Sequence, residues 1–327
     1  MEPVYGQILQ KGYGLRLLRA TRTRTGVVCA TDRGLRELKK YAGDEGRLAF
    51  DHGARERLFA AGFGQVLRYH PTLEGRLSVV WNDQRYVLED YAPALPEGAE
   101  ETYRQAAFGT LAALHRAAEG LFLPCPQTGL GKLPETFARR RRELIRCRNW
   151  VKGRGGTAAV DRLLLKSWED AVRRIDRAAE LLENSGYGAL CQRAGERGAF
   201  CHNAYKTDNL RLSGNRLFVT GFDRAGYDLW VTDLADALRR QLRRGAEGAA
   251  LGGLWQAYRQ VRPLERGEAQ VLMALLTYPQ RYLKLINAYY NKRRVCVSQA
   301  EVARLRECLE SREREDAALA NLWKSLF

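Results

Sequence analysis

The stretch Phe200-Cys-His-Asn-Ala-Tyr-Lys-Thr-Asp-Asn-Leu210 carries the pattern that decides the fold of this 327-residue chain. It is a polar loop that leads into two short apolar runs, 209–212 and 217–220. Between them stands Ser213-Gly-Asn-Arg216, a tetrapeptide rich in turn-forming residues. The pattern therefore predicts one β-hairpin that directly follows a loop containing a histidine.

The first 92 residues are predicted to be rich in strands. The turn signal Asp32-Arg-Gly34 separates the first two strand-like runs, and Asn82-Asp-Gln84 separates the last two. A helix is predicted between the second and third strands. The predicted order is therefore two strands, one helix and three strands, at residues 26–32, 35–41, 46–61, 65–69, 77–81 and 85–91.

Helical patterns dominate after a connector, Ala92-Pro-Ala-Leu-Pro-Glu-Gly98. Apolar residues then recur every three or four positions, which is typical of helices that bury one face. A small strand-rich lobe over 1–92 and a larger helical lobe over 93–327, with the hairpin loop at about 200–225, have the layout of the protein-kinase-like fold. We therefore predict a bilobal α+β protein.

The composition is that of an ordinary globular protein. Hydrophobic residues make up 45% and charged residues 28% of the chain, which excludes a disordered chain, a collagen-like fibre and a small disulfide scaffold. No apolar run approaches the roughly 18–20 residues that a bilayer span needs. The N-terminal sequence lacks a basic start followed by an apolar stretch, so we expect a protein that stays inside the cell.

The seven cysteines do not form a recognisable framework. Their number is odd and none forms a Cys-x-x-Cys pair, which disfavours both a set of disulfides and a zinc site. We expect most of them to be small buried apolar residues. They stand at positions 29, 125, 147, 191, 201, 296 and 308.

The chain is strongly basic, with a formal net charge of +16. Only ten of its 54 cationic residues are Lys, and the one dense basic run is Arg139–Arg142. No interleaved aromatic residues or reading motif accompany the charge, so nucleic-acid binding rests on charge alone and is disfavoured. A steep salt dependence of DNA binding would favour it. An acidic protein or surface fits the charge equally well as a partner.

Phosphoryl transfer on the predicted fold requires few side chains. A strand Lys holds the nucleotide phosphates, a catalytic-loop Asp accepts the proton of the nucleophile, and an Asn and a second Asp hold metal ions. His202 and Asn209 have the spacing of the pattern His-x-Asp-x-x-x-x-Asn, but Ala204 occupies the Asp position. After the hairpin, Gly221-Phe-Asp223 stands where a metal-binding Asp is expected first, and Gly221 occupies that position.

Several segments together resemble the CotS-like family of bacterial spore coat proteins, which have the aminoglycoside phosphotransferase/choline kinase fold. Their order and spacing extend from about residue 25 to about residue 320 and make the resemblance specific. The segments are Thr31–Lys39, Tyr86–Tyr91 at the hinge between the lobes, Leu111–His115, Phe200–His202, Asp233–Asp236 and Tyr278–Lys292.

The resemblance implies that Lys39 is the phosphate-holding strand Lys. Lys40 is the alternative if the register differs by one residue, and because strand residues alternate between faces the two assignments exclude each other. The helix Glu that pairs with this Lys is expected near Gly53. Glu56 lies one helical turn further along the same face and is the candidate substitute.

The resemblance also implies roles for residues near the hinge and after the catalytic loop. Glu89 and Tyr91 are candidate residues of the nucleotide cleft. Asn209 and Asp223 keep metal-ligand side chains, although two such residues make a weak site. Asp233, near the start of a helix, is expected to be structural, because a carboxylate there can accept hydrogen bonds from free backbone N–H groups.

Two side chains near the degenerate positions, Ala204 and Gly221, where the expected carboxylates are missing, complete the candidate site. His202 is expected to be a packed, hydrogen-bonded loop residue rather than a base. Asp208 lies close to Ala204 in sequence but is offset from the position that the reaction requires. No residue is therefore assigned as catalytic.

The absence of both carboxylates favours a pseudokinase, in which the fold is kept and the reaction is lost or very weak. Loss of a general base alone typically lowers a rate about 10²–10⁴-fold. The resemblance implies a role in coat assembly with other spore coat proteins, first in the mother-cell cytoplasm and then in the coat. ATP is the candidate cofactor, with a weak or absent Mg²⁺ requirement. The alternative is an active small-molecule or protein kinase that uses displaced acids such as Asp208 and Asp223.

Overall fold

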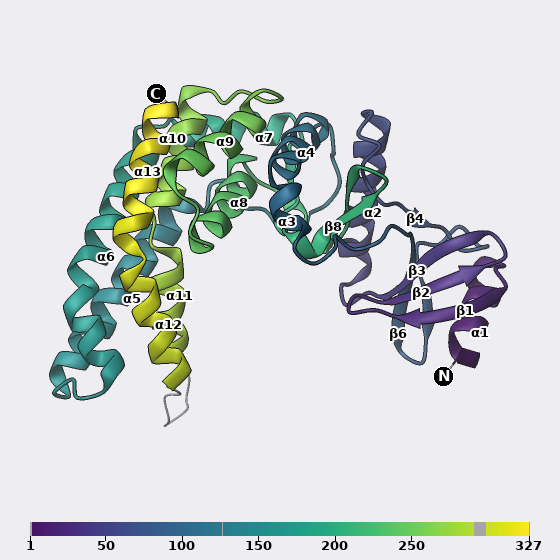
Figure 1. Cartoon of the computed structure of the whole chain (residues 1–327), viewed down its shortest axis with the longest axis horizontal. Coiled ribbons are helices and arrows are strands. Elements are labelled where there is room, and N and C mark those ends of the chain that lie inside the picture. The colour runs from purple at the N-terminus through teal and green to yellow at the C-terminus, as the bar shows by residue number, and fades with distance from the viewer. Residues whose placement is uncertain (1, 126, 291–298, 327) are drawn as a thin grey trace. The chain divides into compact units, whose positions relative to one another are not determined.

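The computed structural model describes residues 2–125, 127–290 and 299–326. The chain folds into two compact units. The first comprises residues 1–128 and 196–228, and the second comprises residues 129–195 and 229–327. The mixed α+β class predicted from the sequence is confirmed, with a sheet near the N-terminus and a larger helical part (Figure 1). The lobe boundary at residue 92 stays a prediction.

The first unit is built on a six-stranded antiparallel sheet. Its strands follow the order β1-β2-β3-β6-β4, and β5 pairs with β6 beyond the end of β4. The sheet comprises β1 (Leu17–Arg22), β2 (Val27–Thr31), β3 (Gly34–Lys40), β4 (Tyr69–His70), β5 (Val79–Trp81) and β6 (Gln84–Asp90).

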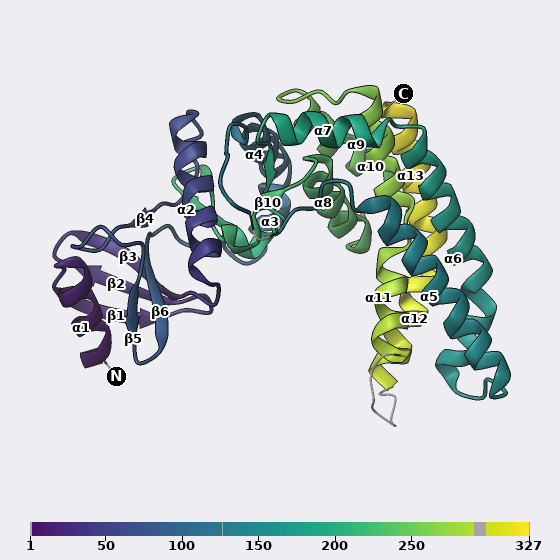
Figure 2. The ribbon, with the colours of Figure 1, turned by 180° about the vertical axis from the view of Figure 1, so that it is seen from behind.

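Helices accompany the sheet on both sides. Leu38 of β3 lies in one core cluster with Ile8 and Leu9 of α1 (Glu2–Tyr13), whereas Val87 of β6 lies in another with Leu48 of α2 (Glu45–Ala60) (Figure 2). Because neighbouring strand residues point to opposite faces, Lys39 points away from the α1 core. The same alternation that buries Leu38 therefore directs Lys39 to the α2 side of the sheet.

Two N-terminal elements are additions to the predicted order of two strands, one helix and three strands. The structure begins with α1 and with a further strand, β1. The sequence of β1, Leu17-Leu-Arg-Ala-Thr-Arg22, is mostly polar because this is an edge strand, and most of its residues are exposed. The apolar stripe of α1 is short, so neither element has a strong periodic signal.

The predicted hairpin is present and is joined to the sheet unit. Strands β8 and β9 pair from Leu210–Val219 to Ser213–Arg216. The backbone N–H of Leu67 donates to the Val219 carbonyl at 3.1 Å, which fixes the end of β9 beside β4. The remaining elements of this unit are α3 (Ala99–Thr102), α4 (Arg104–Ala117), β7 (Phe200–Cys201), β8 (Leu210–Ser213), β9 (Arg216–Val219), β10 (Gly226–Tyr227) and the 3₁₀ turns η1 (Thr207–Asn209) and η2 (Phe222–Arg224).

The second unit is helical throughout its described residues. Helix α6 contacts α5, α10 and α12, while α13 contacts α9, and the long helices lie side by side in both views (Figures 1 and 2). The elements are α5 (Leu133–Gly153), α6 (Ala159–Glu183), α7 (Tyr187–Glu196), α8 (Val231–Arg243), α9 (Gly248–Arg259), α10 (Arg266–Thr277), α11 (Gln280–Tyr290), α12 (Gln299–Glu310) and α13 (Arg312–Leu326).

The apolar stripes seen in the sequence form the core of these helices. Leu164, Ile175, Leu272 and Ile286 are each at most 2% exposed. Of the six cysteines in the described ranges, all are unbridged and four are buried, as expected for small apolar residues. Cys296, and the last two residues of the 278–292 segment, lie outside the described residues. Across the ranges that the structure describes, no helix is long and apolar enough to cross a bilayer.

Leu38→Ala tests the assignment of the sheet faces. Leu38 is 2% exposed and fills the core under α1, so truncation is expected to lower the free energy of unfolding by about 2–5 kcal/mol. Leu35→Ala is the matched control on the same strand, because Leu35 is 49% exposed, and it is expected to change that free energy by no more than about 0.5 kcal/mol. Urea unfolding measures both. Equal effects of the two substitutions would contradict the register of β3.

Candidate functional site

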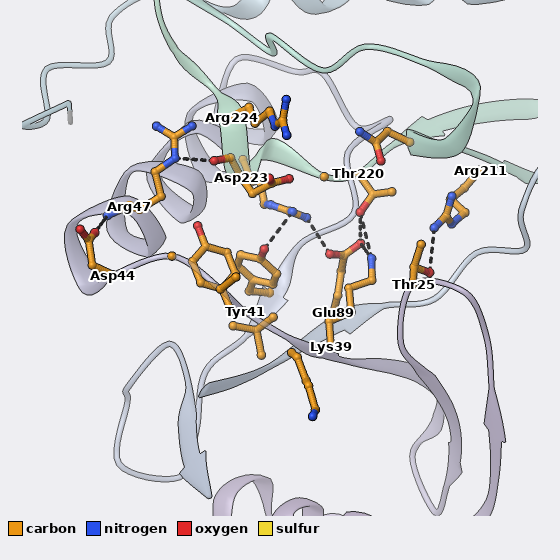
Figure 3. Close-up of a pocket in the computed structure, with 18 of the residues that line it drawn as sticks. Thr25, Lys39, Tyr41, Asp44, Arg47, Glu89, Arg211, Thr220, Asp223 and Arg224 are labelled. Carbon is orange, nitrogen blue, oxygen red and sulfur yellow. Dashed lines mark hydrogen bonds and ion pairs between the residues drawn. The ribbon is translucent and has the colours of Figure 1, made fainter. Parts of the chain in front are cut away.

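A cleft of about 820 Å³ lies entirely within the first unit (Figure 3). Strands β3 and β6 and the start of α2 form one side, and the segment from Asn209 to Arg224 forms the other. Residues from three separate parts of the sequence therefore line one space. The residues used below are Thr25, Lys39, Lys40, Tyr41, Arg47, Arg55, Glu89, Asn209, Arg211, Thr220, Gly221 and Asp223.

Lys39 is the strand lysine whose charge lies inside the cleft. Its Nζ lies 3.1 Å from Glu89 Oε1, 3.2 Å from Glu37 Oε2 and 3.3 Å from Thr220 Oγ1. Lys40 also lines the cleft, but it is exposed. Of the two lysines, Lys39 is therefore the one bound to the buried acids, and its role in holding phosphate stays a prediction.

Glu89 is the buried centre of this arrangement. It is fully buried, accepts a hydrogen bond from the Thr220 hydroxyl, and lies 3.1 Å from Arg55 Nη1 through its second oxygen. Burial by itself would raise the pKa of the Glu89 carboxyl. Lys39 and Arg55 outweigh burial, so this pKa lies below its ordinary value. Glu89 is therefore an anion held between two cations.

Arg55 is the residue that α2 contributes to the network, and it is itself fixed by neighbours. Its Nε donates to Asp51 at 2.6 Å, one helical turn earlier, and its Nη2 donates to the Tyr69 hydroxyl at 3.1 Å. The guanidinium also lies 4.0 Å from the centre of the Tyr69 ring. Helix α2 therefore directs a cation, Arg55, toward Glu89. The resemblance implied instead that this helix would direct an acid toward Lys39.

Glu56 does not reach Lys39. Its carboxylate instead forms a two-pronged ion pair with Arg68, through contacts of 2.8 and 2.5 Å. In the structure the acidic partners of Lys39 are Glu37 from the same strand and Glu89 from β6. The pairing expected for Glu56 is corrected accordingly: the helix face that points to Lys39 carries Arg55, one residue away.

The two degenerate positions lie next to Asn209. Asn209 Nδ2 donates to the Ala204 carbonyl oxygen at 2.9 Å. Gly221 has φ +77°, and a Cβ placed on it would lie 2.7 Å from Asn209 Cγ and Oδ1. Glycine accepts this backbone conformation without strain. The amide of Asn209 therefore occupies the volume that a side chain at position 221 would need.

His202 is a packed loop residue. It is fully buried, its Nδ1 accepts the Ala204 backbone N–H at 3.2 Å, and its Nε2 lies 3.0 Å from the Thr220 carbonyl oxygen. These partners assign the proton to Nε2, since a carbonyl can only accept. The ring also lies 4.5 Å, between centroids, from Phe222. His202 therefore links the loop to the end of β9.

The two nearby acids differ in accessibility. Asp208 forms ion pairs with Arg24 and, at 3.3 Å, with Lys206, and the hydrogen bond from Arg24 lowers the pKa of its carboxyl. It is not among the residues that line the cleft. Asp223 does line the cleft and is exposed, while its carbonyl oxygen accepts a hydrogen bond from Arg47. Only Asp223 of the two faces the cleft.

The turn between β1 and β2 is bonded to both sides of the cleft. The Thr25 hydroxyl donates to Glu37 at 2.6 Å, and Arg211 Nη2 lies 3.4 Å from the same hydroxyl. Arg24, the preceding residue, holds Asp208. The turn therefore ties strand β3 to the hairpin next to Lys39.

Two further predicted residues lie away from the cleft lining. Tyr91 directly follows β6 and is half-buried, and it is not among the lining residues. Asp233 is 2% exposed in the first turn of α8, in the second unit. Of the predicted set, the residues that line the cleft are therefore Lys39 and its alternative Lys40, Glu89, Asn209, Gly221 and Asp223.

Sequence reasoning missed three residues that shape the cleft. Glu37 could have been predicted as a partner of Lys39, because the two residues are two positions apart on one strand and therefore lie on the same face. Arg55 carried a weaker signal in its helical spacing from Asp51. Thr220 has no sequence signal of its own, since only the fold brings its hydroxyl to Glu89.

The acidic groups do not assemble a metal centre. Within 2–125, 127–290 and 299–326, no three His, Cys, Asp or Glu side chains come together in a way that could hold an ion. Mg²⁺ is usually held through one or two carboxylates together with phosphate oxygens. Of the carboxylates that line the cleft, Glu89 is bound to Lys39 and Arg55, and Asp44 accepts the backbone N–H of Arg47. Asp223 and the amide of Asn209, the two metal-ligand side chains predicted from the sequence, both line the cleft, and their metal role stays a prediction.

Comparisons with known proteins agree with the fold. A family model described as "Spore coat putative kinase YutH" matches residues 7–322. No curated protein matches the chain. The chain is similar to the crystal structure of an aminoglycoside phosphotransferase from Alicyclobacillus acidocaldarius, with a TM-score of 0.85, 19% identity, and coverage of 98% of this chain and 95% of that one.

Two further solved structures have the same fold at lower similarity. A spectinomycin phosphotransferase solved with ADP and spectinomycin gives a TM-score of 0.58 at 13% identity, covering 98% of each chain. A choline/ethanolamine kinase family protein from Mesorhizobium loti gives 0.55 at 15% identity, also covering 98% of each. At these identities the likeness concerns the fold alone.

Glu89→Gln tests the buried charge network. Removing one partner of a buried ion pair is expected to lower the free energy of unfolding by about 3–5 kcal/mol at neutral pH. The pKa of Glu89 is lowered on folding, so its contribution is complete above the ordinary value of 4.5 and is lost as pH falls through the folded-state pKa. The difference from the unsubstituted protein should therefore shrink below pH 4.5.

Urea unfolding at neutral and at acidic pH measures this difference. Glu56→Gln is the matched control, because its pair with Arg68 is partly exposed, at 33% for the Glu56 side chain, and should contribute at most about 1 kcal/mol. A gap between Glu89→Gln and the unsubstituted protein that is unchanged across this pH range would refute the assigned charge state of Glu89.

Proposed function

The chain belongs to the spore coat kinase family whose model it matches over residues 7–322, and from this premise we propose that it is a pseudokinase that acts in coat assembly. The observation that carries the proposal is the pair Ala204 and Gly221, which lie on either side of the Asn209 amide. A methyl group and a hydrogen atom stand there in place of two carboxylates. The fold is kept, and its role is to present surfaces to other coat proteins.

Both missing carboxylates would slow the reaction. A missing proton acceptor lowers a phosphoryl-transfer rate by about 10²–10⁴-fold. A missing metal carboxylate removes a ligand that would neutralise the transferring phosphate. Asp208 does not compensate, because its carboxylate is bound to Arg24 and Lys206. These losses support a very slow or absent reaction.

A retained phosphotransferase is the second candidate function. The observation that favours it is Asp223, whose carboxylate is exposed on the cleft that also contains Lys39. ATP would then be held through Lys39, and a cation through Asp223 and Asn209. The two candidates differ in whether nucleotide binding depends on Mg²⁺.

The proposed partners are other spore coat proteins or an acidic surface. The formal net charge of +16 supports attraction to acidic partners over a range set by ionic strength. We further propose that the protein acts first in the mother-cell cytoplasm and then in the coat, and its spore coat family supports the second location.

ATP binding distinguishes the two candidates. For a pseudokinase, isothermal titration calorimetry should give weak binding that is the same in Mg²⁺ and in EDTA, because the cleft lacks the carboxylate at position 221. Lys39→Ala should reduce this binding, whereas Lys40→Ala, which removes the same charge one residue away, should not. Submicromolar binding that strictly requires Mg²⁺ would favour the active kinase.

Restoring the carboxylates tests the two degenerate positions. Gly221→Asp alone should restore Mg²⁺-dependent nucleotide binding without fast turnover, and Ala204→Asp alone should do little. The double substitution should exceed the sum of the single effects, because groups that act as a unit are not additive. Phosphate transfer or hydrolysis and Mg²⁺-dependent ATP binding are the measurements.

Gly221→Asn and Ala204→Asn are the matched controls. Asn at 221 faces the same positive φ and the same contact with Asn209, but it lacks the charge. Thermal unfolding of each variant comes first, since a side chain at 221 requires Asn209 to move. If the unsubstituted chain transfers phosphate and Ala204→Asp leaves that rate unchanged, the placement of the catalytic loop is wrong.

A further inference from the structure

A second cavity, of about 280 Å³, lies wholly within the helical unit and is surrounded by cations. Its walls come from α6, the C-terminal end of α8, the link from α10 to α11, α12 and α13 (Figure 1). Seven basic side chains and three acidic ones line it. Those used below are Arg239, Arg240, Arg243, Lys284 and Arg312.

The acids of this cavity are already bound to other groups. Asp236 accepts from Arg239 at 2.6 Å, and Asp316 holds Arg174 through contacts of 2.8 and 2.5 Å. Glu315 accepts a hydrogen bond from the Ser311 hydroxyl at 2.9 Å. Two of the three acids are thus paired with two of the seven cations. Arg281 and Arg312 are paired with acids outside the lining, with Glu307 at 2.8 Å and with Asp170 at 2.6 Å. Even with these two acids included, the seven cations outnumber the five acids.

Arg239 shows the resulting shortage of negative charge. Its Nη1 donates to Asp236 and its Nη2 to the Leu275 carbonyl, but its Nε is buried and has no partner among the described residues. Burial is the main cause that lowers the pKa of the Arg239 guanidinium, and repulsion from Arg243 adds to it. Arginine does not deprotonate in proteins, so the imbalance remains as unfavourable electrostatic energy.

Arg240 and Arg312 are two further cations of the lining, from α8 and α13. Burial lowers the pKa of Arg240 as well, and Arg243 again contributes by repulsion. Arg312 reaches the cavity from α13, where its Nη1 donates to Asp170 at 2.6 Å. Its Nη2 is buried and has no partner within the described ranges. Arg239 and Arg312, which line the cavity from different helices, therefore each have one buried N–H that lacks a partner among the described residues.

The dipole of α8 explains only part of this cluster. Cations are favoured near a helix C-terminus, which accounts for the basic residues in the last turn of α8. It does not account for Lys284 on α11 or Arg312 on α13, which line the same space from other helices. A charged ligand in the cavity would account for all of them.

We propose that this cavity is a binding site for a small doubly charged oxyanion, of the phosphate or phosphate-monoester class. Arginine donors match the oxygens of such an ion in pairs, and the surplus of cations favours a dianion over a monocarboxylate. The volume lies just below the roughly 300–1,000 Å³ of ordinary ligand pockets, so a small ligand is expected. The site is separate from the Lys39 cleft and does not depend on the proposed pseudokinase role.

Calorimetric titration of the full chain at constant ionic strength tests the proposal. The probes are inorganic phosphate, phenyl phosphate and acetate, at about pH 7.5 where a phosphate monoester carries close to two charges. Phosphate and phenyl phosphate should bind, and acetate should not. Preference for phenyl phosphate would identify an esterified ligand, and preference for inorganic phosphate would identify the free ion. Absence of phosphate binding, or equal binding of acetate, would overturn the proposal.

Arg243→Gln and Lys284→Gln locate the bound ion. Both side chains line the cavity and are exposed, so neither substitution should disturb folding, and each should weaken phosphate binding about tenfold. Arg306→Gln is the matched control, since Arg306 is exposed on α12 and does not line the cavity. An equal loss with Arg306→Gln would assign the binding to general charge. Phosphate binding that is unchanged in both Arg243→Gln and Lys284→Gln would assign it to another site, and either result would overturn the proposal.

Discussion

The burial of one carboxylate, Glu89, sets the arrangement of the cleft. A fully buried anion requires partners, and Lys39, Arg55 and the Thr220 hydroxyl supply them from β3, α2 and the end of β9. Three elements that are far apart in sequence must therefore meet at one point. In this arrangement the charge of Lys39 is already balanced by protein groups, so a nucleotide phosphate would have to compete with two glutamates for it.

The sequence predicted the fold class because its strongest signals are local ones. Turn residues around Gly34 and Gly214 separate alternating apolar runs, and the stripes through Leu164 and Leu272 are long enough to identify helices. α1 and β1 escaped prediction for the opposite reason. β1 is a polar edge strand, and tertiary contacts rather than its own pattern place it in the sheet.

The sequence predicted only those parts of the site that lie within a single strand or a single loop. The positions of Ala204, Asn209 and Gly221 follow from spacing along the chain, whereas the resemblance implied Lys39, with Lys40 as the alternative. The partner of Lys39 does not, because Glu56 and Arg55 are neighbours on one helix and only the packing angle of α2 decides which of them reaches the sheet. The basic cavity of the second unit is likewise invisible in sequence, since its cations come from α6, α8, α11 and α13.

The fit between Gly221 and Asn209 has a consequence for how this protein can change by single mutations. The amide fills the space that a carboxylate at position 221 would occupy, and the backbone there has a left-handed conformation that most side chains resist. Gly221→Asp would first reduce stability, and it would restore little catalytic turnover while Ala204 remains. In the proposed pseudokinase, selection for kinase activity would therefore have to pass through single variants that are less stable or inactive. This barrier would keep position 221 without a carboxylate, while surface residues could change freely.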